Sequence, residues 1–468
     1  MVFVGREEEL QIIQQALQSK RPELLAIYGR RRIGKTYLVR TFCAKYLVFE
    51  FSGAYKTPYK IQLGNFDRVL QSKRGKYLPP TNWFEAFAQL EKYLSSLTRK
   101  SKKVVFLDEF PWADTHRSQF LRAFEYFWNT YASKQEDVVV IICGSSASYM
   151  VQKILNNKGG LHNRLTERIA LKSFTLRETK QFLEAKKIKL TNYDILQLYM
   201  VIGGVPFYLD KLTRGESVPQ AINRLCFSKD GFLRREFNNI FISLFEQSEN
   251  HEAVVRALAA VRKGIRRNEI QSKTKIASGG TLTSTLRQLE ESGFIEQYVP
   301  IFSTKDALYR LTDEYSLFYL RFIENSRPSK GAWLRLQTKP IYKIWSGFCF
   351  ESICIKHIET IKEALGIQAI YSTQGNWIKK GKVQGAQIDL LIDRDDNVIN
   401  LCEMKFYNGP YALDKKSAEN LRDKLSLFQR ETKTTKNIFI TLITTYGVKE
   451  TKYSKELVHQ YLDVGDLF

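Results

Sequence analysis

The stretch Ala26-Ile27-Tyr28-Gly29-Arg30-Arg31-Arg32-Ile33-Gly34-Lys35-Thr36 decides the fold of the N-terminal part of the chain. Its spacing, Gly-x-x-x-x-Gly-Lys-Thr, is typical of a loop that binds nucleotide phosphates: backbone N–H groups surround phosphate oxygens, the lysine reaches the terminal phosphates and the threonine holds Mg²⁺. The apolar residues before it predict a buried strand, and residues 37–42 predict a helix whose N-terminus favours phosphate. We therefore expect an ATP site formed by Gly29, Arg30, Arg31, Arg32, Ile33, Gly34, Lys35 and Thr36.

Two further apolar stretches end in polar residues. Residues 103–107 lead into Asp108 and Glu109, and residues 138–144 lead into Ser145. Apolar strands separated by helical stretches predict a parallel α/β sheet. A carboxylate at the end of a buried strand suits a Mg²⁺-bound nucleotide, so we assign Asp108, with Thr36, to Mg²⁺ and Glu109 to the general base. Ser145 or Ser146 would stand beside the γ-phosphate; the alternative is an ordinary turn at the end of a strand.

Residues 252–311 show a different pattern. Helices are expected at 253–261, from Arg267 onward and at 281–293, followed by strands at 294–299 and 307–311. This order predicts a winged helix-turn-helix. In that arrangement Thr281, Thr283, Ser284 and Arg287 would face a DNA groove, although packing against protein is an equal alternative.

A hairpin near the C-terminus carries the second chemical signal. Apolar strands at 387–393 and 398–406 flank a turn in which Asn397 can adopt left-handed φ. If the hairpin is symmetric about Asp396, Asp389 and Glu403 oppose each other with Cβ atoms roughly 5 Å apart. Lys405 projects from the same face as Glu403. Two adjacent carboxylates favour a hard divalent cation, and the lysine can orient or activate an attacking water.

Several N-terminal segments together resemble the archaeal-type ATPases of the STAND/AAA+ group. They are Phe3 to Arg6, Gly29 to Thr36, Phe106 to Glu109, Gly144 to Ser146, Arg164 and Gly203 to Leu209. The resemblance implies a helical lid at 171–245, a segment around Gly5 and Arg6 that closes over adenine, and Arg164 as the cation for the γ-phosphate. A solvated Arg164 is the alternative. The run Arg30 to Arg32 departs in part from the family without affecting phosphate binding.

The hairpin, within residues 340–440, resembles the PD-(D/E)XK nuclease superfamily. The resemblance implies that Asp389, Glu403 and Glu351, the acid of the first helix, are metal ligands. It also implies that Asp389 and Glu403 act in catalysis with Lys405, the catalytic lysine. Ile388 replaces the usual proline before the first acid. The alternative is a surface hairpin with solvated acids that pair with the lysine.

Composition limits the partners and the compartment. The chain has 468 residues with 72 Lys and Arg against 49 Asp and Glu, a net charge of +23, which favours association with polyanions. Six cysteines without a C-x-x-C pair indicate core residues in a reducing compartment. Because no apolar run reaches about 18 residues and the N-terminus lacks a signal-peptide pattern, we expect a cytoplasmic protein with no membrane contact.

We therefore expect an α/β chain of four parts. They are a P-loop NTPase domain with a parallel sheet (1–170), a helical lid (171–245), a winged helix-turn-helix (246–325) and an α/β restriction-endonuclease-like domain (332–468). The expected function is ATP hydrolysis coupled to a nuclease that uses Mg²⁺ or Mn²⁺ on nucleic acid, DNA rather than RNA; a homo-oligomer is left open. Two alternatives are a nucleotide-switched DNA-binding or signalling ATPase with a non-catalytic nuclease-like domain, and an ATPase that acts only on proteins.

Overall fold

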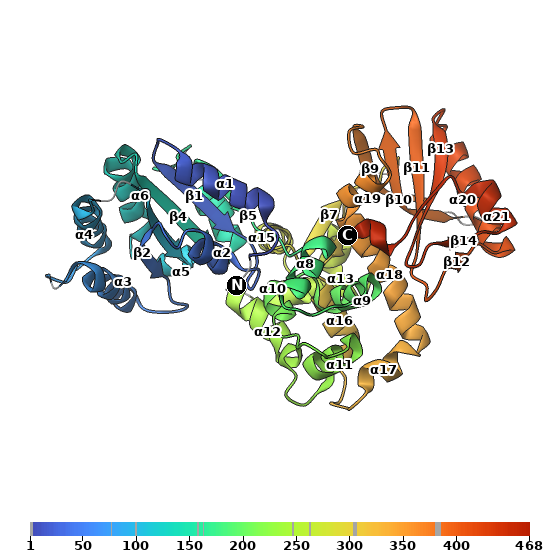
Figure 1. Cartoon of the computed structure of the whole chain (residues 1–468), viewed down its shortest axis with the longest axis horizontal. Helices are drawn as coiled ribbons and strands as arrows, with labels where there is room; N and C mark the ends of the chain where they lie inside the picture. The colour runs from blue at the N-terminus through green and yellow to red at the C-terminus, as the bar shows by residue number, and fades with distance from the viewer. Residues whose placement is uncertain are drawn as a thin grey trace. The chain divides into compact units, whose positions relative to one another are not determined.

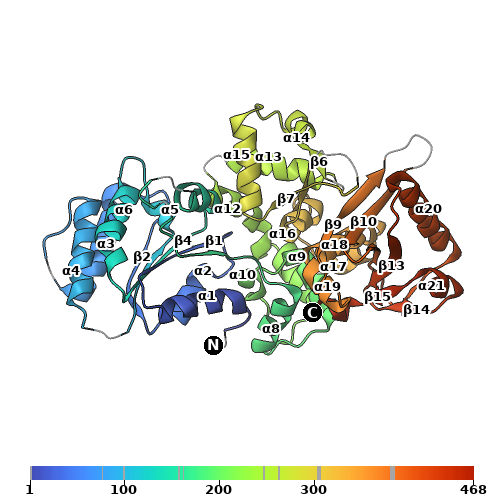
Figure 2. The ribbon, with the colours of Figure 1, turned by 90° about the horizontal axis from the view of Figure 1, so that it is seen from above.

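A computed structural model describes residues 3–75, 77–98, 101–156, 159–161, 163–245, 248–261, 264–302, 307–379 and 385–468. The chain divides into two compact units. The first comprises residues 1–173 with two short later segments, 242–246 and 287–293, and the second contains the remainder. Figures 1 and 2 show the elements of each unit.

The first unit is built on a five-stranded sheet in which all strand pairs are parallel. The strand order is β2-β3-β4-β1-β5. The strands are β1 (Glu23–Tyr28), β2 (Leu47–Ser52), β3 (Lys103–Asp108), β4 (Val138–Gly144) and β5 (Glu167–Ala170). The parallel sheet predicted from residues 24–28, 103–108 and 138–144 is therefore confirmed.

Helices cover both faces of this sheet because the strands β1, β3 and β4 are buried on both sides. Along β1, Leu25 and Ile27 join a core with α1 (Glu7–Gln18) and α2 (Lys35–Phe42). Leu24 and Ala26 face the opposite core, which is rich in aromatic side chains. That second core contains α3 (Tyr59–Arg74), α4 (Trp83–Ser96) and α6 (Phe120–Thr130). Alternate side chains of a strand point to opposite faces, so a continuously apolar strand requires this double cover.

Helices follow the sheet where a lid was expected. They are α8 (Leu176–Ala185), α9 (Asn192–Ile202), α10 (Pro206–Leu209), α11 (Val218–Ile222) and α12 (Phe232–Leu244). Gly204 between α9 and α10 accepts a hydrogen bond from the Phe174 N–H at 2.7 Å. A Cβ at position 204 would lie 1.9 Å from the Phe174 carbonyl oxygen, so only glycine permits this contact.

The next segment contains three helices and a small antiparallel sheet. The helices are α13 (Ser248–Ala259), α14 (Arg267–Thr274) and α15 (Gly280–Glu291), and the sheet order is β6 (Ile265–Arg266), β8 (Leu308–Leu311), β7 (Ile295–Tyr298). Strand β6 was not predicted. Arg267 donates hydrogen bonds to the Gly279 carbonyl and the Thr283 hydroxyl, at 3.2 and 2.8 Å. Thr281, Thr283 and Arg287 are all exposed, and the proposed contact with DNA stays a prediction.

The C-terminal part is a five-stranded mixed sheet with helices. Its order is β15-β13-β11-β10-β9, antiparallel among β9, β10 and β11 and parallel from β11 to β15. The strands are β9 (Ser372–Lys379), β10 (Ala386–Arg394), β11 (Val398–Lys405), β13 (Asn437–Thr444) and β15 (Gln460–Leu462), and a separate pair is β12 (Tyr411–Ala412) and β14 (Val448–Lys449). The helices are α16 (Glu314–Phe318), α17 (Ala332–Gln337), α18 (Pro340–Lys356), α19 (Ile358–Ala364), α20 (Lys415–Thr432) and α21 (Lys452–Leu457).

The predicted hairpin register is confirmed. Leu390 pairs with Cys402 and Ile392 with Asn400, each pair equidistant from Asp396. Asn397 has φ 65°, as the turn requires. Leu427 and Phe428 of α20 pack on the sheet face that carries the Leu391, Ile399 and Leu401 side chains. Because Glu403 and Lys405 continue the alternation of Ile399 and Leu401, they lie on the face that α20 covers.

The first domain boundary and the state of the cysteines were both predicted from the sequence. The predicted boundary after residue 170 lies near Ser173, where the first segment of the first unit ends. Most of the expected lid, residues 174–241, belongs to the same contact unit as the nuclease-like segment, so the division between them stays a prediction. All six cysteines are free and buried. Across the described ranges, no helix is long and apolar enough to cross a membrane.

Candidate functional site

The phosphate loop joins the central strand β1 to α2. Gly29 has φ 143°, and a Cβ there would lie 2.2 Å from the Leu171 carbonyl oxygen, so the loop requires glycine at this position. Gly34, with φ 92°, precedes the first turn of α2. The Lys35 ammonium is buried and donates hydrogen bonds to the carbonyls of Gly29 and Arg30, at 3.0 and 2.9 Å. The lysine therefore lies inside the loop, and its contact with nucleotide phosphates stays a prediction.

The two acids after β3 reach different partners. The Thr36 hydroxyl donates a hydrogen bond to Asp108 Oδ2 at 2.8 Å, so the two predicted Mg²⁺ ligands are adjacent. Glu109 Oε2 accepts hydrogen bonds from the Ser145 hydroxyl at 2.7 Å and the Ser145 N–H at 3.2 Å. Ser145 is fully buried. Strand β4 lies between β1 and β3, and its end brings Ser145 to Glu109.

The arginines near the loop have different environments. Arg30 is buried, whereas Arg31 and Arg32 are partly exposed and Arg32 has φ 75°. Arg164 is exposed in a turn closed by its N–H on the Leu161 carbonyl, and its catalytic role stays a prediction. Arg6 is buried and donates to the Ile33 carbonyl at 3.3 Å. The segment expected to cover adenine therefore also supports the phosphate loop, a contact that local sequence could not show.

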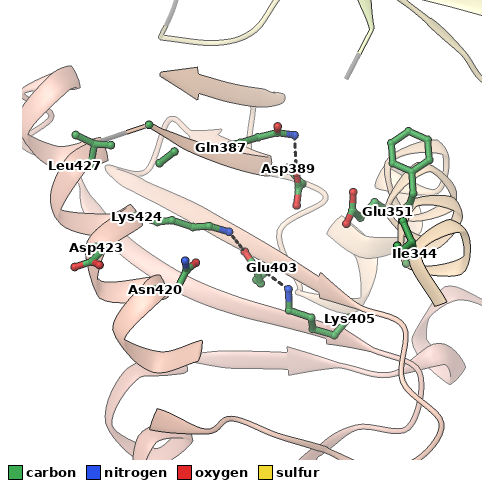
Figure 3. A pocket seen from close by; sticks show the side chains of 14 residues that line it. Ile344, Glu351, Gln387, Asp389, Glu403, Lys405, Asn420, Asp423, Lys424 and Leu427 are labelled. Atoms are coloured by element: carbon green, nitrogen blue, oxygen red, sulfur yellow. Dashed lines mark hydrogen bonds and ion pairs between the residues drawn. The ribbon is translucent and has the colours of Figure 1, made fainter. Parts of the chain in front are cut away.

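The C-terminal acids line one cavity of about 730 Å³ (Figure 3). Glu351 comes from α18, Asp389 from β10, and Glu403 and Lys405 from β11. Glu403 is buried, and its Oε1 receives a hydrogen bond from Lys405 Nζ at 2.6 Å. The predicted set of three acids and one lysine thus lines the same cavity. A smaller hollow of about 220 Å³ lies beside it and shares Glu403, Lys405 and Asn420.

The cavity concentrates negative charge. Burial, followed by the charge of Asp389, raises the pKa of Glu351 to about 8. Burial and the Glu403 carboxylate raise the pKa of Asp389. Burial also raises the pKa of Glu403, but Lys405 and Lys424 outweigh it, so the net shift is downward. The acids therefore compete for too little positive charge, as expected where a cation is required.

The donor set suits a hard cation with water ligands. No three Asp, Glu, His or Cys side chains in the described part of the chain lie close enough to enclose a metal ion. Mg²⁺, however, is often held by one or two carboxylates and several waters. Gln387, whose Nε2 donates to Asp389 Oδ1 at 2.8 Å, keeps its Oε1 buried without a hydrogen-bond partner. That unpartnered oxygen belongs to a side chain that contacts Asp389 and lines the same cavity as Glu403, and it fits a cation or one of its waters.

Helix α20 supplies residues that sequence reasoning missed. Lys424 Nζ donates to Glu403 Oε2 at 2.9 Å, so each oxygen of Glu403 holds one lysine. Asn420, Asp423, Lys424 and Leu427 line the cavity at the i, i+3, i+4, i+7 spacing of one helical face. That spacing was the available signal, but only the packing of α20 on the sheet turns this face toward Glu403.

The N-terminal part of the chain matches a known protein family, and most of the chain matches an archaeal protein. Residues 3–212 match a family described as an ATPase domain predominantly from Archaea. An uncharacterized protein of Methanocaldococcus jannaschii is 27% identical over 408 residues, 85% of each chain.

Two solved structures are also similar to this chain. The Walker-type ATPase of Pyrococcus abyssi is 18% identical with a TM-score of 0.48, covering 68% of this chain and 96% of that one. The ORC2 protein of Aeropyrum pernix, solved as ADPNP–ADP complexes, is 14% identical with a TM-score of 0.44, covering 71% of this chain and 94% of that one. The family match and the phosphate loop between β1 and α2 lead to one conclusion: residues 3–212 form an ATPase domain of the archaeal type.

Proposed function

We propose that this chain binds and hydrolyses ATP and that its C-terminal domain is a metal-dependent nuclease acting on DNA rather than RNA. The observation that carries the nuclease proposal is the shared cavity of Glu351, Asp389, Glu403 and Lys405. One helix and two paired strands contribute these side chains, and a net charge of +23 favours a polyanionic substrate.

ATP hydrolysis would use the contacts of the phosphate loop. Lys35 would exchange the Gly29 and Arg30 carbonyls for the terminal phosphates. Thr36 and Asp108 would hold Mg²⁺, which supplies charge neutralisation at the phosphates. Glu109, oriented by Ser145, would accept a proton from the attacking water.

Phosphodiester hydrolysis would use the C-terminal cavity. Asp389 and Glu403 would hold the divalent cation, which stabilises the charge that develops on the phosphate. Lys405 would orient the attacking water. The oxygen of this water bonds to phosphorus and releases a proton to solvent, while the bond to the leaving sugar oxygen breaks and that oxygen takes up a proton from solvent. Glu351 would be the third acid of the metal site, since it lines the same cavity and lies near the Asp389 charge that helps to raise its pKa.

The proposed coupling runs through the helices after the ATPase sheet. Tyr193 of α9 stacks on Phe406 with ring centroids 5.6 Å apart, and Phe406 directly follows Lys405. A displacement of α9 would therefore be transmitted to the end of β11. We propose that this contact links nucleotide state to the nuclease cavity.

The test is a cleavage assay with the full chain on single-stranded DNA, double-stranded DNA and RNA. Mg²⁺ or Mn²⁺ is supplied with and without ATP. We expect DNA cleavage that Asp389→Asn and Lys405→Met abolish and that Lys415→Met, an exposed lysine on α20, leaves unchanged. Intact DNA under every condition would overturn the nuclease proposal, while loss of ATP turnover in Lys35→Ala tests the ATPase separately.

A second candidate function is a nucleotide-switched DNA-binding or signalling protein with a non-catalytic nuclease-like domain. The observation that favours it is the pair of lysines that neutralises Glu403. It predicts DNA retention without cleavage, unchanged by Glu403→Gln and sensitive to Lys35→Ala.

A further inference from the structure

Lys424 is placed in the C-terminal cavity by an element separate from the hairpin. It comes from α20, whereas Glu403 and Lys405 come from β11. Its side chain is 17% exposed, and that of Lys405 is 38% exposed. Figure 3 shows the two ammonium groups approaching Glu403 from opposite sides. Lys424 is therefore held inside the cavity and is not a solvated surface lysine.

One carboxylate does not require two ammonium groups. The single charge of Glu403 is already matched by Lys405 at 2.6 Å. Lys424 also acts electrostatically on Glu351 and Asp389, lowering the pKa of each. It is thus a cation near three carboxylates, in the region where a bound divalent cation would also lie.

A divalent cation on Glu403 would compete with Lys424. A metal ion held by the Glu403 carboxylate would lie close to the Lys424 ammonium, and two cations a few ångströms apart repel strongly in a partly buried site. Lys424 has a flexible four-carbon stem and three N–H donors, so it can leave Glu403 for another anion in the same cavity. A phosphate oxygen of the substrate is the anion that the proposed function brings there.

We propose that Lys424 is a phosphate-positioning residue of this site. Its ammonium occupies Glu403 in the ligand-free protein and transfers to a phosphate oxygen of the nucleic acid when a divalent cation binds Glu403. This inference rests on the proposed nuclease function. It assigns Lys424 a role different from that of Lys405, which stays beside the attacking water.

The first experiment measures the binding of Mn²⁺ to the full chain in the absence of nucleotide. Binding is monitored through the electron paramagnetic resonance signal of the Mn²⁺ that stays free. The Mn²⁺ that the wild type binds and the Asp389→Asn variant does not bind is assigned to the C-terminal site. Lys424→Met should bind this Mn²⁺ about tenfold more tightly, because a nearby positive charge is removed. Lys424→Arg should retain the wild-type affinity, and Lys415→Met, which removes a 75% exposed lysine from the same helix, should do the same.

The second measurement is the salt dependence of binding to a fluorescent DNA oligonucleotide with Ca²⁺ in place of Mg²⁺. A lost phosphate contact lowers the slope of log K against log salt by about one. Lys424→Met should show this decrease and Lys424→Arg should restore the slope. Thermal melts of all variants establish that each is folded.

The outcomes separate this inference from the proposed function. If Asp389→Asn binds Mn²⁺ as the wild type does, the proposed metal site is wrong, and the proposed role of Lys424 is wrong as well. If Asp389→Asn loses Mn²⁺ but Lys424→Met shows no tighter binding or no change of slope, only the role of Lys424 is overturned. Tighter Mn²⁺ binding together with a lower slope supports the proposal.

Discussion

His357 provides a pH-dependent stability that can be worked out from the structure. It is buried at the end of α18, and its Nε2 accepts a hydrogen bond from the Leu176 N–H at 3.0 Å. Its Nδ1 lies 2.8 Å from the Ile353 carbonyl, so the neutral ring with a proton on Nδ1 satisfies both contacts. Burial lowers the pKa of His357 from 6.5 to about 4. Protonation would place a donor opposite the Leu176 N–H and an unpaired charge in the core.

Because the pKa of His357 is lower in the folded protein than in the unfolded chain, the protein is less stable at acidic pH. The stabilisation is fully present above the unfolded pKa, near 6.5, and is lost as the pH falls toward 4. The full difference is about 3 kcal/mol, since each pKa unit corresponds to about 1.4 kcal/mol. Roughly 2 kcal/mol of it is lost between pH 7.5 and pH 5.

The assay compares urea unfolding of the wild type and His357→Asn at pH 7.5 and pH 5, followed by circular dichroism. All other titrating groups are present in both proteins, so their contribution cancels when the two are compared. Between the two pH values we therefore expect the free energy of unfolding of the wild type to fall by about 2 kcal/mol more than that of the variant. An NMR titration of the His357 ring gives the pKa directly. Equal pH dependence of both proteins, or a pKa near 6.5, would refute the reasoning.

Three further predictions concern the ATPase domain and the helices that follow it. Lys35→Ala should abolish ATP binding in calorimetry without lowering the melting temperature, because its hydrogen-bond partners are loop carbonyls that water can reach once the side chain is gone; retained binding would contradict the phosphate role. Ser145→Ala should lower kcat for ATP about tenfold at unchanged ATP affinity, since a charge-assisted hydrogen bond of about 1.5–3 kcal/mol orients Glu109; an unchanged kcat would remove Ser145 from catalysis. Gly204→Ala should destabilise the protein by at least about 2 kcal/mol in chemical denaturation, because the new Cβ would lie 1.9 Å from the Phe174 carbonyl oxygen; a neutral effect would mean that the backbone shifts freely there.

Much of both candidate sites could be predicted because their residues are close in sequence or belong to regular elements. The symmetric register about Asp396, observed for the four pairs from Leu390–Cys402 to Asp393–Ile399, predicted that Asp389 and Glu403 lie close together. The alternation of a strand predicted that Lys405 lies on the same face. By contrast, Lys424 follows Glu403 by 21 residues and meets it only because Leu427 and Phe428 anchor α20 on that face of the sheet. Thr283, expected to face a DNA groove, is bonded to Arg267 across a turn, a contact that helical spacing does not reveal.

The sequence by itself determined the phosphate loop, the parallel sheet behind it and the pairing of the C-terminal hairpin. These features follow from local rules: glycine at positive φ, apolar strands that need cover on both faces, and the two-residue period of a strand. Only the tertiary structure decided which groups from distant segments meet, as with Ser145 on Glu109, Arg6 on the Ile33 carbonyl and Lys424 on Glu403. Such contacts depend on strand order and on how helices pack against the sheet, and these are set by burial of the whole core and not by any single stretch of chain.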